Sequence, residues 1–260
     1  MDELTAAQYH LVDQPLRGLG FNTYFCRAIA AGQAPGRIIV DDLADPTAYY
    51  FRHSCGMSLL VGDHGNQRFA EELIDLLSQR TQDEWLQIDP PVWRPVLSEL
   101  LDSPRVMHYR RQDFSFDAAR YERLGFDSSR YDIVAMTPDM YAGIEGAVVP
   151  TDFWSSAELF AATGQGFGAV ESGQIVATAF SAFVLDGALE ISIETRPDRR
   201  GQGYATAVCV ALIDYCLAHG LEPVWSCRFE NTASVQLAQK LGFVPTVQLP
   251  YFQIQAVPPS

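Results

Sequence analysis

The stretch that decides the fold is residues 193–206, which read Ile-Glu-Thr-Arg-Pro-Asp-Arg-Arg-Gly-Gln-Gly-Tyr-Ala-Thr. Before it, residues 189–195 alternate apolar and polar side chains, the period-two pattern of a half-buried β-strand. After it, residues 205–218 place apolar side chains at helical spacing. The stretch is therefore expected to be a tight turn that joins a strand to the N-terminus of a helix.

This turn has the properties of an anion-binding site. The free N–H groups and the dipole at a helix N-terminus favour an anion, and glycines such as Gly201 and Gly203 let a ligand approach the backbone. The chain carries a formal net charge of −14, yet three of its 18 Lys and Arg residues lie between positions 196 and 200. An anionic ligand explains this concentration of cations, and the alternative is an ordinary solvated strand-to-helix turn.

Composition limits the class of protein. A chain of 260 residues with 48% hydrophobic and 19% charged residues is typical of soluble globular proteins. Its acidic charge argues against nucleic acid and anionic membranes as partners. The five cysteines form no CxxC pair and no metal-ligand spacing repeats, so we expect a reducing compartment and no metal site. Without a signal-peptide pattern or a long apolar stretch, we expect a cytoplasmic protein.

The chain is expected to contain two domains. Residues 1–128 have mixed helical and strand patterns without a motif that carries chemistry, and residues 129–256 form the second domain, followed by a tail at 257–260. The segment Tyr121–Phe126 resembles Ala238–Phe243, since both are helix ends that stop at a glycine followed by Phe. The first domain is therefore either a degenerate copy of the second or an unrelated α/β domain.

Two motifs of the second half resemble those of the GNAT superfamily of acyl-CoA N-acyltransferases. The coenzyme motif matches Arg200-Gly201-Gln202-Gly203-Tyr204-Ala205, and the second motif matches Asn231 together with Lys240-Leu241-Gly242-Phe243. The resemblance covers about residues 131–254. It implies an α+β fold with a mixed, mostly antiparallel central sheet flanked by helices, preceded here by a smaller α/β domain. It also implies acetyl-CoA as co-substrate and no metal.

The resemblance implies a set of coenzyme-binding residues around the turn and the following helix. They are Ile193, Thr195, Arg200, Gly201, Gln202, Gly203, Tyr204, Ala205, Thr206, Asn231 and Ser234. Ser234 could equally be a small residue that packs the helix on the sheet. The segments Trp225–Cys227 and Asn231–Ser234 are similar to a subgroup that includes zwittermicin A resistance-type acetyltransferases.

The chain departs from the family at one catalytic position. Many members have a Tyr four residues before the terminal glycine of the second motif, where this chain has Ala238. Tyr251 and Cys227 are the candidates for a proton donor in its place. Tyr251 could instead fill a sheet edge, and Cys227 could belong to the core.

Acetyl transfer to an amine also requires a proton acceptor. Glu190 and Glu194 are four positions apart on one strand, so they share a face with Ser192. Glu194, nearer the turn, is the preferred base, and the alternative is a carboxylate that pairs with Arg196. Glu190 is the second choice.

Asp152, Phe153 and Trp154 precede a helix at the place where the family builds its acceptor pocket. An aromatic pair beside a carboxylate would suit a cationic amine. The alternative is that Trp154 packs a loop against the core.

These features predict an N-acetyltransferase that moves an acetyl group from acetyl-CoA to a primary amine of a small molecule, by direct attack in a ternary complex. An antibiotic is one candidate acceptor. A protein or peptide N-acetyltransferase and a non-catalytic acyl-CoA sensor are the alternatives. The first half could shape the acceptor site or form the surface of a homodimer.

Overall fold

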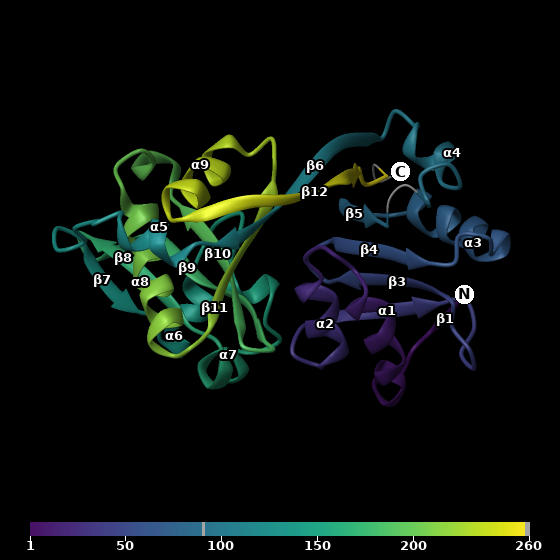
Figure 1. The fold of residues 1–260 in the computed structure, drawn as a ribbon, viewed down its shortest axis with the longest axis horizontal. Helices are drawn as coiled ribbons and strands as arrows, with labels where there is room; N and C mark the ends of the chain where they lie inside the picture. The colour runs from purple at the N-terminus through teal and green to yellow at the C-terminus, as the bar shows by residue number, and fades with distance from the viewer. Residues whose placement is uncertain (90–91, 258–260) are drawn as a thin grey trace. The chain divides into compact units, whose positions relative to one another are not determined.

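The computed structural model describes residues 1–89 and 92–257 (Figure 1). The chain forms two compact units. The first contains Met1–Gln112, Arg228–Glu230 and the residues from Val247 onward, and the second contains Asp113–Cys227 and Asn231–Thr246. Strands β6 (Val106–Phe116) and β12 (Phe243–Ile254) each contribute residues to both units.

The first unit is built on a sheet with the strand order β1-β2-β3-β4-β5-β12. Its neighbouring strands run antiparallel, except for the parallel pair β4 and β5. The strand bounds are β1 (Asp2–Glu3), β2 (Gly36–Val40), β3 (Ala48–His53), β4 (Met57–Gly62) and β5 (Glu84–Ile88).

The helices of the first unit are η1 (Ala6–Val12), α1 (Asp13–Arg17), α2 (Tyr24–Ala30), α3 (Gln67–Ser78) and α4 (Ser98–Leu101). Helix α3 begins after Asn66, whose side chain accepts a hydrogen bond from the N–H of Phe69, as expected of an N-cap. Its apolar stripe is buried against the sheet with Leu60, Leu86 and Phe252. Burial of this stripe holds the helix on the sheet.

The second unit has the strand order β11-β10-β9-β8-β7. Its pairs are antiparallel except β10 with β11. Strands β8 and β9 form a hairpin through Ser172-Gly173, and both residues have the positive φ that its tight turn requires. The strand bounds are β7 (Asp132–Ala135), β8 (Gly166–Glu171), β9 (Gln174–Leu185), β10 (Ala188–Thr195) and β11 (Glu222–Arg228). A mixed, mostly antiparallel sheet with flanking helices is the expected fold class.

The helices of the second unit are α5 (Ala118–Glu122), α6 (Pro138–Gly143), η2 (Pro150–Asp152), α7 (Ala157–Thr163), η3 (Pro197–Arg199), α8 (Tyr204–Ala218) and α9 (Thr232–Lys240). Helix α8 is the central one, with Val208, Leu212 and Ile213 fully buried. It packs on the face of the sheet that carries Leu189 and Ile191.

The opposite face of this sheet carries Glu190, Ser192 and Glu194, because side chains alternate along β10. Ser192 lies directly across from Phe180 of β9, and Phe180 forms a second cluster with Trp154 and residues of α6 and α7. The elements that follow β7 therefore cover the face on which Glu194 lies.

The same topology occurs once in each unit. Strands β2, β3 and β4 form an antiparallel series, and α3 then leads to β5, parallel to β4. Strands β8, β9 and β10 repeat this order, and α8 then leads to β11, parallel to β10. The sequence echo of 121–126 and 238–243 marks elements that are not equivalent, since α5 follows β6 whereas α9 precedes β12. The topology supports a duplicated fold better than that echo does.

The two units are assembled from other segments than the expected domains at 1–128 and 129–256. Residues 113–128 belong to the second unit, because Tyr121 packs in its core and its hydroxyl donates a hydrogen bond to Asp214 of α8 (2.6 Å). Residues 228–230 and 247–257 belong to the first unit, where β12 pairs with β5. Of the expected tail at 257–260, only Val257 lies within the described residues, and its N–H donates to Arg80 O (2.7 Å).

Candidate functional site

The predicted strand–turn–helix is present, with β10 ending at Thr195 and α8 beginning at Tyr204. Gly201 (φ +75°) and Gly203 (φ +90°) both lie in the left-handed region that favours glycine. A Cβ atom at Gly203 would overlap the hydroxyl of Tyr131, which donates a hydrogen bond to Gln202 O (2.9 Å). A Cβ atom at Gly201 would meet no atom within 4 Å. Packing against Tyr131 therefore requires glycine at position 203, whereas Gly201 borders open space.

No side chain caps the N-terminus of α8, where Gly203 is the N-cap residue. The first N–H groups of an α-helix have no partner within the helix, so those of Tyr204, Ala205 and Thr206 can receive a ligand. In a helix of 15 residues, the backbone dipole favours an anion at this end.

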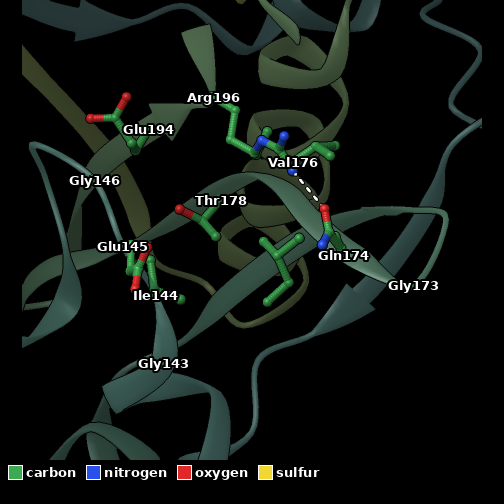
Figure 2. A pocket seen from close by; sticks show the side chains of 12 residues that line it. Gly143, Ile144, Glu145, Gly146, Gly173, Gln174, Val176, Thr178, Glu194 and Arg196 are labelled. Carbon is green, nitrogen blue, oxygen red and sulfur yellow. Dashed lines mark hydrogen bonds between the residues drawn. The ribbon is translucent and has the colours of Figure 1, made fainter. Parts of the chain in front are cut away.

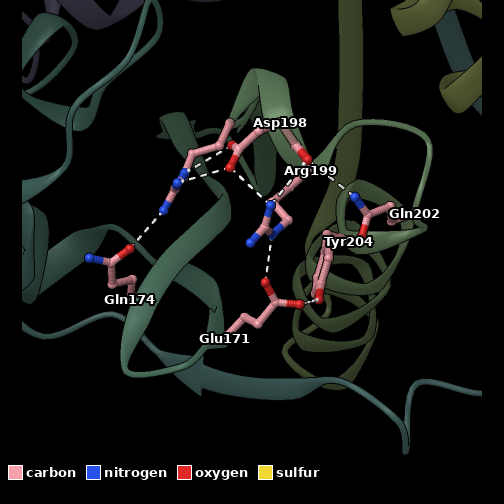
Figure 3. Close-up of polar contacts among 7 residues, drawn as sticks. Glu171, Gln174, Asp198, Arg199, Gln202 and Tyr204 are labelled. Carbon is pink, nitrogen blue, oxygen red and sulfur yellow. Dashed lines mark hydrogen bonds and ion pairs between the residues drawn. The ribbon is translucent and has the colours of Figure 1, made fainter.

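The three arginines of the turn are paired with carboxylates, and Figure 3 shows Arg199 with Glu171 and Asp198. Arg196 pairs with Asp198 (3.0 Å), Arg199 pairs with both Glu171 (2.5 Å) and Asp198 (2.9 Å), and Arg200 pairs with Glu194 (3.4 Å). Carboxylates in the turn and next to it thus neutralise the three arginines that are concentrated there. The argument for an anion site consequently rests on the backbone of the turn more than on its charge.

Glu171 ties the β8–β9 hairpin to this turn (Figure 3). Its carboxylate accepts hydrogen bonds from the hydroxyl of Tyr204 and from Nε of Arg199, and these bonds lower its pKa, the one from Tyr204 most strongly. On the same hairpin, Gln174 accepts a hydrogen bond from Arg196 (2.9 Å). The turn is therefore braced by side chains before any ligand binds.

Strands β10 and β11 separate beside the turn. Their parallel pairing covers Ala188–Glu190 and Glu222–Val224, although β10 continues to Thr195 and β11 to Arg228. In the first unit, by contrast, β4 and β5 stay paired from Met57 and Trp85 to Ile88, the end of β5. The second unit thus has a gap in its sheet beside the turn.

Three other predicted coenzyme residues, Thr206, Asn231 and Ser234, have structural partners. Thr206 is 4% exposed and its hydroxyl accepts from Nζ of Lys240 (3.2 Å). The side chain of Asn231 caps α9 by accepting from the N–H of Ser234 (3.3 Å), and the hydroxyl of Ser234 accepts from the indole of Trp225 (3.2 Å).

Two predicted positions lie at the end of β10. Ile193 is half-buried against the core under α8. Thr195 is 9% exposed, and its hydroxyl has no hydrogen-bond partner among the described residues.

The two candidate bases lie on the same face of β10, as predicted, in different surroundings. Glu190 is 6% exposed and accepts a hydrogen bond from the hydroxyl of Ser226 (2.9 Å). The side chain of Glu194 is 16% exposed and accepts from its neighbour's backbone N–H (3.1 Å) and from Arg200.

Glu194 lines a cavity of about 650 Å³ (Figure 2). The walls are the segment Gly143–Gly146 at the end of α6, the segment Gly173–Thr178 at the start of β9, Glu194 of β10, and Arg196, which follows that strand. Glu190 does not line this cavity. Sequence reasoning missed Glu145 and Thr178, which belong to no motif, and the only available signal was that Thr178 is the single polar residue in the apolar run 175–180.

The predicted acceptor residues lie beside η2 and do not line this cavity. Asp152 accepts from the N–H of Val149 (3.4 Å), and Phe153 packs on Phe180. Trp154 is 2% exposed and its indole donates to Ser181 O (2.7 Å), which matches the core role weighed against acceptor binding.

The two predicted proton donors, Tyr251 and Cys227, lie in different units. Tyr251 belongs to the first unit, is 5% exposed and packs against Trp85, and burial raises its pKa to about 12. A group with that pKa is a poor acid at neutral pH. Cys227, at the end of the second unit's segment, is half-buried against the core of that unit.

Within residues 1–89 and 92–257, no cluster of three or more His, Cys, Asp or Glu side chains could hold a metal ion. Across that part of the chain, every helix is too short or too polar to span a bilayer.

The chain is similar to known proteins of one family. The family model described as GNAT acetyltransferase matches residues 18–252. An uncharacterised N-acetyltransferase of Bacillus subtilis, YdfB, is 25% identical over 230 residues, which cover 84% of this chain and 85% of that protein.

Solved structures show the same fold. A GCN5-related N-acetyltransferase-like protein of Streptococcus suis superposes with a TM-score of 0.77 at 23% identity, over 95% of this chain and 98% of that one. A tandem GNAT protein from the clavulanic acid biosynthesis pathway superposes with a TM-score of 0.64 at 13% identity, over 99% and 98%. The match to the family model extends beyond the second half of the chain that the sequence motifs marked. The chain belongs to the GNAT acetyltransferase family.

Proposed function

We propose that the chain moves an acetyl group from acetyl-CoA to a primary amine of a small molecule, by direct attack in a ternary complex. Acetyl-CoA is the co-substrate of the GNAT family, to which the chain belongs. The observation that carries the proposal is the second unit's strand–turn–helix, which has a gap between strands on one side of the turn and an uncapped helix N-terminus on the other, with Glu194 paired to Arg200 of the turn.

The residues of the turn fit the coenzyme. The N–H groups of residues 202–206 would hold its pyrophosphate, with Gly201 leaving room for a phosphate to approach. The main chain of Ile193 and Thr195, on the stretch of β10 that has left β11, would hold the arm. Asn231 and Ser234 keep their assignment from the resemblance, and each already has a structural partner.

When bound, the coenzyme supplies an activated acetyl thioester. The residues of this chain would then orient the amine and remove its proton. Glu194 is the preferred proton acceptor because it borders the cavity and keeps some contact with solvent. Glu190 is more deeply buried than Glu194 and is better placed to orient other groups.

The cavity favours a small acceptor over a protein. Its volume of about 650 Å³ lies within the range of roughly 300–1,000 Å³ that is typical of small-molecule sites. A peptide would instead need an open groove. The sequence resemblance to zwittermicin A resistance-type enzymes adds amine antibiotics to the candidate acceptors.

A non-catalytic acyl-CoA sensor is the second candidate, and one observation favours it. Ala238 is fully buried where many family members have Tyr, and the pKa of Tyr251 is raised to about 12. In a sensor, acetyl-CoA would bind without transfer of its acetyl group.

Release of free CoA thiol in the presence of an amine panel tests the proposal, with an amine antibiotic among the acceptors. We expect turnover with at least one amine. Glu194→Gln should lower kcat by about 100-fold or more, with little change in acetyl-CoA affinity, as for a lost general base. Acetyl-CoA binding without thiol release for any amine would support the sensor instead.

A further inference from the structure

We infer that the cavity beside Glu194 binds an acceptor with two cationic amino groups, one at Glu194 and the other at Glu145. This inference rests on the proposed function for the statement that the nitrogen at Glu194 is the one acetylated. It adds the class of acceptor and a second recognition residue.

The first observation is a buried hydroxyl that faces the cavity (Figure 2). Thr178 is 2% exposed, and its Oγ1 has no hydrogen-bond partner among the described residues. Thr178 lies directly across from Glu194 in the β9–β10 pair, so the two side chains share a face. A buried hydroxyl without a partner destabilises the fold. Valine has nearly the same shape as threonine and would fill this position without that cost. A ligand donor in the cavity would satisfy it.

The second observation is the charge of the lining. Glu145 and Glu194 contribute carboxylates, and Arg196 contributes the one cation of the lining. Arg196 is paired with Asp198, and Glu194 is paired with Arg200, so these two pairs add no net charge to the lining. Glu145 is exposed, and within the described part of the chain no cation is paired with it. The cavity is therefore negative and favours a cationic ligand over a neutral or anionic one.

The third observation concerns placement. A Cβ atom at Gly146 would come within 2.8 Å of Cγ of Glu194, so the segment that carries Glu145 packs directly against Glu194. Figure 2 shows Thr178 on the floor of the cavity, with Glu145 to one side and the bonded pair of Arg196 and Gln174 to the other. The apolar side chains of Ile144, Ile175 and Val176 complete the lining.

This arrangement suits a flexible diamine. One nitrogen would lie at Glu194, donating to Thr178 Oγ1 as well, and the second ammonium group would pair with Glu145. The carbon spacer would contact the apolar lining. An amine with a carboxylate in place of the second ammonium would be repelled by Glu145.

The test uses the full chain and α,ω-diamines of three to six carbons, each compared with the amino alcohol of the same length. We expect the wild type to favour at least one diamine in kcat/KM. Glu145→Gln should raise the KM for that diamine by about two- to fivefold, as for an exposed ion pair, with little effect on kcat and a smaller effect on the KM for the amino alcohol. Glu122→Gln is the matched control, because Glu122 is also exposed in the second unit and does not line the cavity.

Thr178→Val provides a second variant with an independent readout. We expect its melting temperature to be unchanged or higher, because the buried hydroxyl has no partner to lose. Diamine affinity, measured by calorimetry, should nevertheless fall. A lower melting temperature with unchanged diamine affinity would show that the hydroxyl serves the fold and would overturn the inference.

Calorimetry also separates this inference from the proposed function. Diamine binding that weakens in Glu145→Gln supports the inference even without thiol release, whereas the proposed function would then fail. Thiol release with equal KM for diamine in wild type and Glu145→Gln overturns the inference and leaves the proposed function standing. If no diamine binds or is acetylated, the inference fails whatever other amines do.

Discussion

Replacing Gly203 and Gly201 separately by alanine tests the role of the turn. Both residues have positive φ, and an alanine in the left-handed region costs roughly 1–2 kcal/mol. Only at Gly203 does the new methyl group also meet the hydroxyl of Tyr131, with Arg130 Nη2 3.5 Å away.

Moving Tyr131 would have two further costs. Its hydrogen bond to Gln202 O is worth about 1 kcal/mol, and its edge contact with the ring of Tyr204 is worth about 0.5–1.5 kcal/mol. Gly203→Ala should therefore destabilise the chain by about 3–4 kcal/mol, and Gly201→Ala by about 1–2 kcal/mol.

Thermal unfolding measures the difference, at about 2–4 °C per kcal/mol for chains of 150–250 residues. A double-mutant cycle isolates the clash, because Tyr131→Phe removes the hydroxyl that the methyl group would overlap. In that background the cost of Gly203→Ala should fall toward that of Gly201→Ala, although Cζ of residue 131 still lies 3.2 Å from the new methyl group. Equal costs in the wild-type background, or an absence of coupling to Tyr131, would refute this account of the turn.

For acetyl-CoA affinity, Gly201→Ala is the informative variant, although it is the less destabilising of the two. The methyl group of Gly201→Ala would occupy the open space beside the turn, so acetyl-CoA affinity should fall although the fold changes little. Calorimetry on the folded variant that gave wild-type affinity would show that no phosphate approaches this residue.

Three further predictions concern other parts of the chain. Glu171→Gln removes a carboxylate that competes for Arg199, so acetyl-CoA should bind about two- to fivefold more tightly at low salt, a gain that calorimetry in high salt should abolish. Ser234→Ala should lower the free energy of unfolding by about 1–3 kcal/mol, because the buried indole of Trp225 loses its acceptor, and acetyl-CoA affinity should change only if the hydroxyl also contacts the coenzyme. Burial lowers the pKa of His53 from 6.5 to about 4. The free energy of unfolding should therefore keep its full value above pH 6.5 and fall by up to about 3 kcal/mol toward pH 4. Denaturant unfolding of His53→Gln should not show this loss.

The central elements of the fold could be predicted because their patterns are local. The alternation at 189–195 and the apolar spacing at 205–218 correspond to β10 (Ala188–Thr195) and α8 (Tyr204–Ala218). Each element needs only its own side chains to show which face is buried.

The long strands could not be predicted in full, because their burial depends on distant partners. Strand β6 runs from Val106 to Phe116 and includes Gln112 and Asp113, which are polar and buried. Strand β12 runs unbroken from Phe243 to Ile254 through Pro250. Polar residues and a proline argue against a strand in local patterns, and tertiary pairing overrides them.

The candidate site divides in the same way. The turn is made by backbone N–H groups and glycines at fixed spacing, which a motif records. The cavity is made by side chains from three separate segments, among them Glu145 and Thr178, and no local spacing connects them. The sequence also showed the arginines of the turn without their partners, since Glu171 lies 28 positions before Arg199.

The composition of the first unit has a consequence for synthesis on the ribosome. Its sheet includes the part of β12 from Val247 onward, of which Tyr251–Ile254 pair with β5, whereas the second unit is complete at Thr246. The second unit is thus the first for which every residue has been translated. Until β12 follows, the nascent chain carries β5, with Trp85, Leu86 and Ile88, as an unpaired edge. We expect truncation before residue 247 to leave that edge open and to promote aggregation of the first unit.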